Sequence, residues 1–257
     1  MRRTVDTQAI AIQRYSYAET SQIVHFLSET HGRIVVLVRG AYREKNSYQG
    51  PIDLLVRSRL KVSFVKGREL GLLTARQVET AYLPIRRDYS RYRVASDALR
   101  LVVAATVVGQ TEPGIFRLLD RLLLACCNFP RERLALVSLA FDLRLLRILG
   151  LNPHLHACVR CSSNRGLVAY QASDGGMVCR KCRQPGISSL PMSKEVWMLL
   201  QDLQDRTLRD ISSPSEVVER KAQRLVDAHL AYHLEWKSPG EHRTPRLSLN
   251  RRRRKRA

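Results

Sequence analysis

The first 80 residues alternate between apolar and polar positions with the period of β-strands. From Val56 to Phe64, apolar or small side chains occupy every second position, and basic or polar ones lie between them. Segments 22–27 and 33–39 are rich in β-branched and other apolar residues and are separated by a turn at 28–32. With Ile10 and Ile12 on an earlier strand and a turn at 66–68 before a strand at 70–74, we expect five short strands. They predict a small Greek-key barrel, and an OB-fold is the candidate of that size.

Beyond residue 82 the apolar positions recur every three or four residues, which is typical of amphipathic helices. Glycine, proline and asparagine punctuate this pattern, and Gly109 and Gly150 are placed to end helices. Ser193 can cap a later helix, and Ser213-Pro214-Ser215-Glu216 has the form of a capping box with proline at the first helical position. The helices expected from this pattern are 94–108, 115–126, 134–148, one from Ser193 through Leu203, and one from Ser213 through Tyr232.

The predicted fold class is therefore α+β. An OB-fold-like barrel is expected over residues 1–80 and an α-helical domain over 81–240, with a loop-rich insertion at 154–186. The remaining segment, 241–257, is rich in Pro, Ser and Arg and poor in apolar residues. Such a composition cannot form a core of its own, so we expect this basic tail to be disordered when alone.

The net charge of the chain bears on its function. Lys and Arg exceed Asp and Glu by 44 − 23 = +21. Eight cations and no acid lie in 243–257, which leaves 36 − 23 = +13 on residues 1–242. This positive charge on residues 1–242 predicts a polyanionic partner, most commonly nucleic acid. The alternatives are charge that only keeps the chain soluble and an anionic membrane surface, but no basic amphipathic helix with exposed Trp or Phe supports the latter.

Four of the six cysteines form the pattern Cys158-x2-Cys161-x17-Cys179-x2-Cys182. Because two Cys-x2-Cys knuckles bring four sulfurs to one point, this spacing predicts a tetrahedral Zn²⁺ site. With all four positions filled by thiolate, no position remains for water or substrate, so we expect one structural zinc per chain. The alternative is four unliganded cysteines. The other two, Cys126 and Cys127, follow an apolar run and are interpreted as packing residues.

Basic residues and tyrosines are interleaved in the predicted barrel. A charged groove with aromatic rings can hold single strands without sequence preference, although exposed strand faces are commonly polar without such a role. The aromatic candidates are Tyr15, Tyr17, Tyr42 and Tyr48. The candidate DNA-binding residues are Arg33, Arg39, Arg43, Lys45, Arg57, Arg59, Lys61, Lys66 and Arg68.

The sequence contains none of the common catalytic motifs. GxxxxGK[ST], GxGxxG, HExxH and GxSxG are all absent, so nothing argues for an enzyme. The longest apolar stretch, 101–108, is too short to span a bilayer, and the basic start is not followed by the apolar region of a signal peptide. We therefore expect a cytoplasmic protein without a membrane partner.

Across residues 5–240 the chain resembles the bacterial recombination mediator family RecO. The opening strands Ala9–Ile12 and Tyr17–Val24 are similar to those of the family, as is the stretch Phe141–Leu146 followed by Leu149–Pro153 and the first cysteine pair. Three shorter segments, His31–Ile34, Arg39–Ala41 and Ser193–Glu195, follow the same order and spacing. The run Arg251–Arg256 departs from the family pattern, so the resemblance gives it no role.

The resemblance implies an OB-fold, a helical domain and a zinc-binding insertion in a protein that is not an enzyme. It implies binding of single- and double-stranded DNA and annealing of complementary strands, including strands coated by single-stranded DNA-binding protein (SSB). The implied partners are the acidic C-terminal tail of SSB, RecR, and indirectly RecA and, in some organisms, RecF, at the nucleoid. The rival hypothesis is a zinc-stabilised RNA-binding or ribosome-associated protein, which RNA–DNA competition would distinguish. A nuclease would need an acidic or His-rich metal cluster that the sequence lacks.

Overall fold

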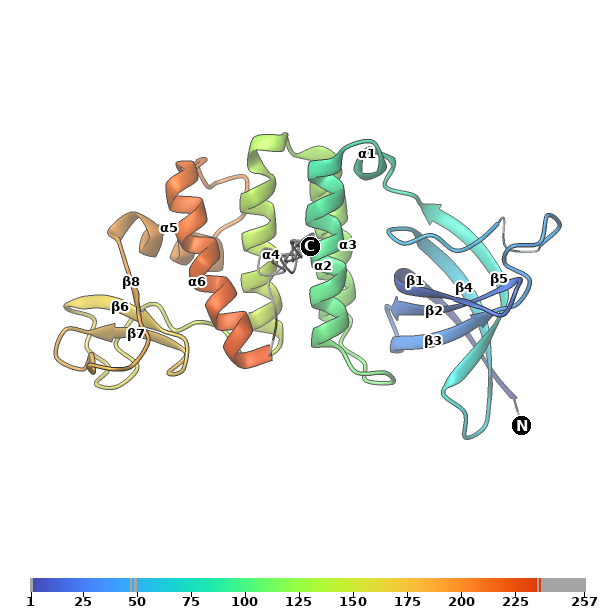
Figure 1. Ribbon diagram of the computed structural model, residues 1–257, viewed down its shortest axis with the longest axis horizontal. Coiled ribbons are helices and arrows are strands. Elements are labelled where there is room, and N and C mark those ends of the chain that lie inside the picture. Colours follow the sequence, from blue (N-terminus) through green and yellow to red (C-terminus); the bar gives the residue numbers. More distant parts are fainter. Residues whose placement is uncertain (1, 47, 49, 235, 237–257) are drawn as a thin grey trace, which may run out of the picture.

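The computed structural model describes residues 2–46, 48, 50–234 and 236. Figure 1 shows a β-barrel at one end, a group of helices in the middle and a small three-stranded sheet at the other end. The basic tail expected over 241–257 lies outside the described residues. No helix in the described part of the chain is both long and apolar enough to cross a membrane.

The barrel confirms the predicted N-terminal fold. Its strands close in the order β1-β2-β3-β5-β4, and β3 and β5 are the parallel pair. One long strand, β1, pairs with β4 through its first half and with β2 through its second, with an irregularity between Ala11 and Gln13 where the strand changes partner. The strands are β1 (Arg2–Tyr17), β2 (Ser21–Ser28), β3 (Gly32–Val38), β4 (Arg57–Val65) and β5 (Leu70–Thr80).

Alternation along the strands fills the barrel, as the sequence predicts. On β4, the side chains of Ser58, Leu60 and Val62 are buried, whereas Arg59 and Lys61 are exposed. The inward positions of the neighbouring strands complete an apolar core. Its other members include Ala9, Ala11, Val24, Phe26, Val36, Val38 and Leu73.

The helices also lie where the apolar period places them, although the one expected from 94 begins at Tyr89 and the one expected over 115–126 runs from Pro113 to Asn128. Two further differences in their ends have identifiable causes. The described helices are α1 (Leu83–Arg86), α2 (Tyr89–Ala105), α3 (Pro113–Asn128), the short 3-10 helix η1 (Arg131–Arg133), α4 (Leu134–Ile148), α5 (Lys194–Asp205) and α6 (Glu216–Leu234). The hydroxyl of Ser193 accepts a hydrogen bond from the amide of Val196, so the predicted cap of α5 is confirmed.

The first difference is that α2 ends at Ala105 and not at Val108. Thr106 has an extended backbone, and Val108 forms a bridge with Arg33 of the barrel instead of continuing the helix. The Arg33 guanidinium donates to the carbonyls of Val103 (2.9 Å) and Thr106 (3.2 Å), which the end of the helix leaves free. A contact with the barrel therefore ends this helix, and the local sequence pattern could not predict it.

The second difference concerns the start of α6. The helix begins at Glu216, and the hydroxyl of Ser215 accepts from the amide of Val218 (3.5 Å). The expected capping box with Ser213 as the cap is wrong by two residues, and Pro214 lies before the helix. Ser215 satisfies the first free amides equally well, because serine is a favoured cap wherever the chain turns.

One core joins the helices to the barrel. Leu119, Leu123, Leu145 and Leu146 are fully buried between α3 and α4, and barrel residues Ile10, Ile12 and Leu27 pack in the same cluster. Cys126 is buried in this cluster and Cys127 is packed against it, so the interpretation of this pair as packing residues is confirmed. The barrel is thus fixed against the helices through apolar side chains.

The third part is a small sheet that carries the cysteines. Its strands are β6 (Leu167–Gln171), β7 (Gly176–Cys179) and β8 (Leu190–Pro191), in the order β7-β6-β8. Tyr170 and Met177 join the main core, and the indole N–H of Trp197 on α5 donates to the carbonyl of Leu155 (2.7 Å). These contacts dock the sheet on α5 and α6.

Candidate metal centre and nucleic-acid interface

The four predicted cysteine ligands meet at one point. The sulfurs of Cys158, Cys161, Cys179 and Cys182 all lie within 4.8 Å of one another, and those of Cys161 and Cys179 are 3.8 Å apart. A tetrahedral zinc site with Zn–S bonds of about 2.3 Å has sulfur–sulfur edges of about 3.8 Å. The donor set and its spacing therefore fit a metal ion held by thiolates alone.

Backbone geometry shapes both knuckles. The amide of Ser162 donates to the carbonyl of Cys158 (2.8 Å), and the amides of Cys182 and Arg183 donate to the carbonyl of Cys179 (3.1 and 3.0 Å). These turns direct the two sulfurs of each knuckle to the same side. The Arg160 side chain links the two knuckles, because it donates to the carbonyl of Cys182 (3.2 Å) and pairs with Asp174 (2.8 Å).

Amide hydrogen bonds favour the thiolate form at two of the four sulfurs. The amide of Cys182 lowers the pKa of Cys179. Burial alone would raise the pKa of Cys158, but the N–H groups of Cys179, Arg160 and Cys161 outweigh it and lower the pKa to about 6. Hydrogen bonds among the sulfurs raise the pKa of Cys182. A bound cation would replace the proton that the clustered thiolates share.

A buried histidine attaches the cysteine sheet to the last helix. His229 of α6 lies between Tyr170 of β6, whose hydroxyl donates to Nδ1 (2.5 Å), and the carbonyl of Leu151, which accepts from Nε2 (2.7 Å). Because the carbonyl accepts the Nε2 proton, Nδ1 of the neutral ring is free to accept from the Tyr170 hydroxyl. Burial lowers the pKa of His229 to about 4.

A second buried group titrates in the opposite sense. Asp142 of α4 accepts a hydrogen bond from the side chain of Gln223 (3.1 Å). Burial raises the pKa of this carboxyl to about 7 despite that bond, and the negative charges of Asp227 and Asp97 act in the same direction as burial. Asp142 therefore takes up a proton in the folded protein well above the range in which it does so in the unfolded chain.

His229 and Asp142 change the free energy of unfolding in opposite directions as the pH falls, so we expect their two contributions to cancel in the wild type. Between pH 7 and 5, protonation of His229 in the unfolded chain lowers the free energy of unfolding by about 2 kcal/mol. Over the same range, protonation of Asp142 in the folded protein raises it by about 2 kcal/mol. We expect His229→Gln to gain stability relative to the wild type as the pH falls, and Asp142→Asn to lose it. Denaturant unfolding of the three proteins at both pH values measures this, and parallel changes in all three would contradict it.

The predicted DNA-binding residues do not form one face. Two of them, Lys66 and Arg68, border a groove of about 840 Å³ at the end of the barrel where β2 turns into β3 and β4 into β5. We call it the turn groove. No acidic side chain is among the described residues that line it. Its other cationic or ionisable side chains are Arg2, Arg3 and His31.

Three more predicted residues border a second groove at the opposite end of β2 and β3. Arg39, Arg43 and Lys45 surround a hollow of about 480 Å³ together with Tyr17 and Tyr48, and we call it the loop groove. The described residues that line it also include no acid. Of the tyrosines predicted to interleave with cations, two therefore lie beside them in one groove.

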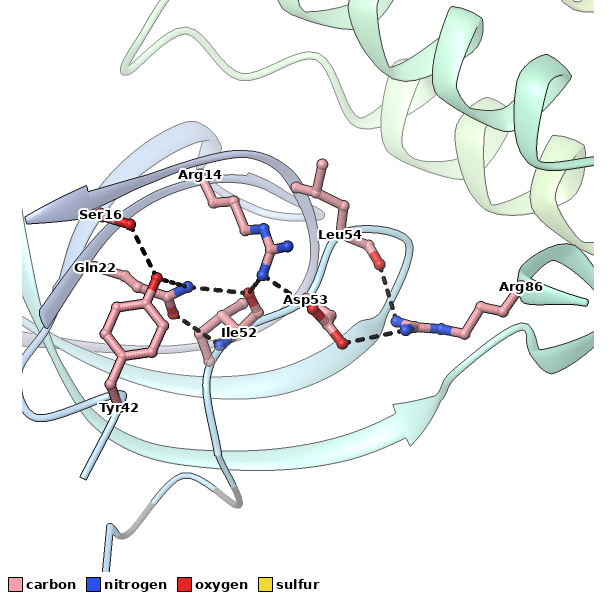
Figure 2. Close-up of polar contacts among 8 residues, drawn as sticks. All are labelled: Arg14, Ser16, Gln22, Tyr42, Ile52, Asp53, Leu54 and Arg86. Atoms are coloured by element: carbon pink, nitrogen blue, oxygen red, sulfur yellow. Dashed lines mark hydrogen bonds and ion pairs between the residues drawn. The ribbon is translucent and has the colours of Figure 1, made fainter. Parts of the chain in front are cut away.

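A polar network holds the loop groove in shape (Figure 2). The buried amide of Gln22 accepts from the backbone N–H of Ile52 (2.8 Å) and donates to the hydroxyl of Tyr42 (3.2 Å). Asp53 pairs with Arg14 of β1 (3.0 Å) and with Arg86 of α1 (3.1 Å). The loop between β3 and β4 is thus tied both to the barrel and to the first helix.

The other four predicted residues lie on the barrel wall or inside a junction. Arg59 and Lys61 are exposed on β4, and Arg59 pairs with Asp6 (2.9 Å). Arg33 and Arg57 are half-buried and donate to acceptors inside the protein. Arg33 donates to a backbone carbonyl of α2 and to the His25 ring. Arg57 donates to the carboxylate of Asp120 on α3 (2.7 Å) and to the hydroxyl of Thr80. Because these two guanidinium groups already join the barrel to the helices, we leave them out of the proposed DNA surface.

Sequence reasoning missed three residues of the turn groove, namely Arg2, Arg3 and His31. Arg3 donates to Nε2 of His31 (3.1 Å), so the start of β1 lies against the β2–β3 turn. Burial and the Arg3 charge lower the pKa of His31. The basic Met1-Arg2-Arg3 start was visible in the sequence, but only the antiparallel pairing of Arg2 and Arg3 with Val65 and Phe64 places it beside Lys66.

Within the described residues, the four cysteines form the only group of three or more His, Cys, Asp or Glu side chains that could hold a metal ion. A hydrolytic metal site would need carboxylate or imidazole ligands and an open coordination position. The described part of the chain offers no such cluster.

Comparisons with known proteins agree with this architecture. Residues 1–82 match the family model described as Recombination protein O N terminal, and residues 86–241 match Recombination protein O C terminal. DNA repair protein RecO of Moorella thermoacetica is 31% identical over 179 residues, which are 68% of this chain and 65% of that protein. The RecO of Pelobacter propionicus is 30% identical over 233 residues, 88% of this chain and 90% of that protein. The RecO of Alkaliphilus metalliredigens is 28% identical over 215 residues, 78% and 83% of the two chains.

Proposed function

Because this chain belongs to the RecO family of DNA repair and recombination proteins, we propose that it binds DNA and anneals complementary single strands. In this proposal it also helps to load the recombinase RecA onto SSB-coated DNA. It acts by binding and not by catalysis, at the nucleoid in the cytoplasm. Its partners are single- and double-stranded DNA, the acidic C-terminal tail of SSB, RecR and, indirectly, RecA and RecF.

The observation that carries the proposal is the pair of acid-free basic grooves at the two ends of β2 and β3. In OB-folds the face of these two strands and the loops β1–β2 and β4–β5 bind oligonucleotides. The loop groove lies at the first of these loops and the turn groove at the second.

Electrostatics supplies the proposed mechanism. Cations on the grooves and on the barrel wall neutralise phosphates and release counterions, which lowers the repulsion between two strands that approach each other. The cations that we assign to this surface are Arg39, Arg43, Lys45, Arg59, Lys61, Lys66 and Arg68 of the sequence prediction, with Arg2 and Arg3 added. The same positive body attracts an acidic peptide such as the SSB tail.

We further propose that the four cysteines hold one zinc ion per chain with a structural role. When bound, zinc cross-links the two knuckles and supplies no open position for chemistry. The ligand set lies in the sheet at the far end of the molecule from the barrel (Figure 1). The ion therefore stabilises the fold and does not contact the proposed DNA surface.

Removing turn-groove cations tests DNA binding. We expect Lys66→Ala/Arg68→Ala to weaken binding of single-stranded oligonucleotides and to flatten the plot of log affinity against log salt by about 0.7 per lost phosphate contact. Fluorescence anisotropy at four salt concentrations measures both effects. A matched control removes the same charge from α6, where Lys221 and Arg224 are exposed. If Lys221→Ala/Arg224→Ala changes the slope as much, net charge and not the groove governs binding.

Competition with RNA of equal length tests the rival function in the same assay. Stronger displacement by RNA than by DNA would favour the RNA-binding alternative. An annealing assay with complementary fluorescent strands, bare and SSB-coated, tests the remaining step. A protein that binds both strands yet does not accelerate annealing would contradict the proposed mediator role.

A further inference from the structure

The start of α2 carries a pair of exposed tyrosines that no core or junction uses. Tyr89 is 80% exposed, the highest value among the large apolar side chains of the described residues that are exposed, and Tyr92 is 47% exposed. Residues three apart lie on the same side of a helix. The two rings therefore lie next to each other on the exposed surface of α2.

The segment that carries these rings is basic. Segment 83–100 contains five arginines and two aspartates, a balance of 5 − 2 = +3. Both aspartates are engaged: Asp88 caps α2 and pairs with Arg131 (2.5 Å), and Asp97 pairs with Arg100 (2.5 Å). Arg87 and Arg93 are exposed. We call Arg87, Tyr89, Tyr92 and Arg93 the tyrosine surface.

The neighbouring groove decides where a polyanion could lie. Tyr89 and Arg93 form one rim of a hollow of about 820 Å³ between α2, α4 and α6. Unlike the two barrel grooves, this hollow contains carboxylates, including the buried Asp142 and the helix residues Glu216 and Glu219. Arginines on the lining, Arg93, Arg100, Arg131 and Arg220, nearly balance its five carboxylates, so the interior of the hollow does not attract phosphates as the barrel grooves do. The exposed Arg87 and Arg93 make the tyrosine surface at its rim the more favourable place for a polyanion.

We propose that the tyrosine surface is a second binding site for single-stranded DNA. Two bases stack on Tyr89 and Tyr92, and the phosphates on either side lie beside Arg87 and Arg93. Stacking on exposed rings next to cations is how proteins hold unpaired strands of any sequence. A duplex has no free base faces to offer, so the site selects single strands.

The connection between this surface and the barrel suits the tyrosine surface to a role in annealing. Arg86, one residue before Arg87, is tied through Asp53 to Arg14 of the barrel (Figure 2). The loop that carries Asp53 also forms the loop groove. The two sites are thus joined by ion pairs, so one strand bound by the barrel and another bound by α2 would be held on connected elements. This step rests on the proposed annealing function.

The test separates base stacking from charge. The full-length Tyr89→Ala/Tyr92→Ala variant is titrated against a thymine oligonucleotide and against an abasic oligonucleotide with the same number of phosphates. We expect at least about fivefold weaker binding of the thymine strand, the loss that corresponds to one stacked base, and unchanged binding of the abasic strand. Tyr89→Phe/Tyr92→Phe should retain wild-type affinity. Tyr232→Ala, which removes a 59% exposed tyrosine from α6, is the matched control.

Each other outcome has a defined meaning. Wild-type affinity of the double alanine variant for both oligonucleotides overturns the second site, and so does an equal loss for both. An equal loss in Tyr232→Ala also overturns it, because the effect would then not be specific to α2. A wild-type protein that binds neither oligonucleotide contradicts the proposed function itself. Loss of binding in Lys66→Ala/Arg68→Ala with no change in the tyrosine variant leaves the barrel site standing and removes only this inference.

Discussion

Replacing Cys179 with serine is expected to lower the melting temperature by about 10 °C and to release the metal. A structural zinc site contributes on the order of 10 kcal/mol to the folding of the segment that it joins, and loss of one of four thiolates removes a large part of this. Cys179 ends β7, and its carbonyl accepts the hydrogen bonds that shape the second knuckle. The sheet that docks on α5 and α6 should therefore lose its order first.

Metal analysis, thermal unfolding and DNA titration of the same samples measure the effect. Zinc should fall from one ion per chain towards none, whereas the DNA affinity of the protein that remains folded should change little, because the grooves lie at the other end of the molecule. Cys127→Ser is the matched control, since that half-buried cysteine lies on α3 and is not one of the four cysteines of the proposed metal site. Purified wild-type protein with far less than one zinc per chain would contradict the assignment.

Asp120→Ala is expected to cost about 2–3 kcal/mol of folding free energy. One carboxylate of α3 accepts from the buried hydroxyl of Tyr82 and from Arg57 of β4 (2.7 Å), so it joins the barrel, the connecting segment and the helices. Burial and the bond to Asp120 raise the pKa of Tyr82, which therefore stays a donor. Truncation leaves that hydroxyl and a half-buried guanidinium without their shared acceptor.

The backbone at Tyr82 adds to this expectation. Its φ of 43° lies in the left-handed region, which costs a non-glycine residue about 1 kcal/mol or more and persists only where surrounding contacts hold it. Denaturant unfolding should show the loss, and Asp120→Asn, which keeps an acceptor oxygen, should recover part of it. Asp97→Ala removes an exposed ion pair on α2 and should change stability by less than about 1 kcal/mol. Equal losses in Asp120→Ala and Asp97→Ala would mean that the junction has no special weight.

How far the sequence predicts the site depends on the range of the contacts involved. The convergence of the four cysteines was predictable because each knuckle is a local turn with a fixed spacing. The outward direction of Arg59 and Lys61 was predictable because strand alternation is local as well. Arg57 has the same alternation, yet its main partner Asp120 lies 63 positions away, and Arg33 reaches a carbonyl 70 positions away. Nothing near either arginine in the sequence distinguishes it from a free surface cation.

The grooves follow the same rule. The turn groove takes cations from the start of β1 and from the β4–β5 turn, which only barrel closure brings together. The loop groove takes its three cations from one loop, but its Tyr17 comes from β1. Composition therefore predicted a basic surface but not its division into two hollows. Tyr89 and Tyr92 escaped notice because the apolar period of α2 is read from its buried side, and exposed rings do not contribute to that period.

Because they share one core, the barrel and the helical part of the chain depend on each other for folding. The family models divide the chain between residues 82 and 86, but Ile10, Ile12 and Leu27 of the barrel are buried in the same cluster as the helices. A barrel excised at this boundary would present these three side chains to water, and the excised helices would present the matching apolar surface. Neither part can therefore be exchanged on its own. A chimera with the barrel or the helices of a distant relative would also need matching side chains on the facing surface.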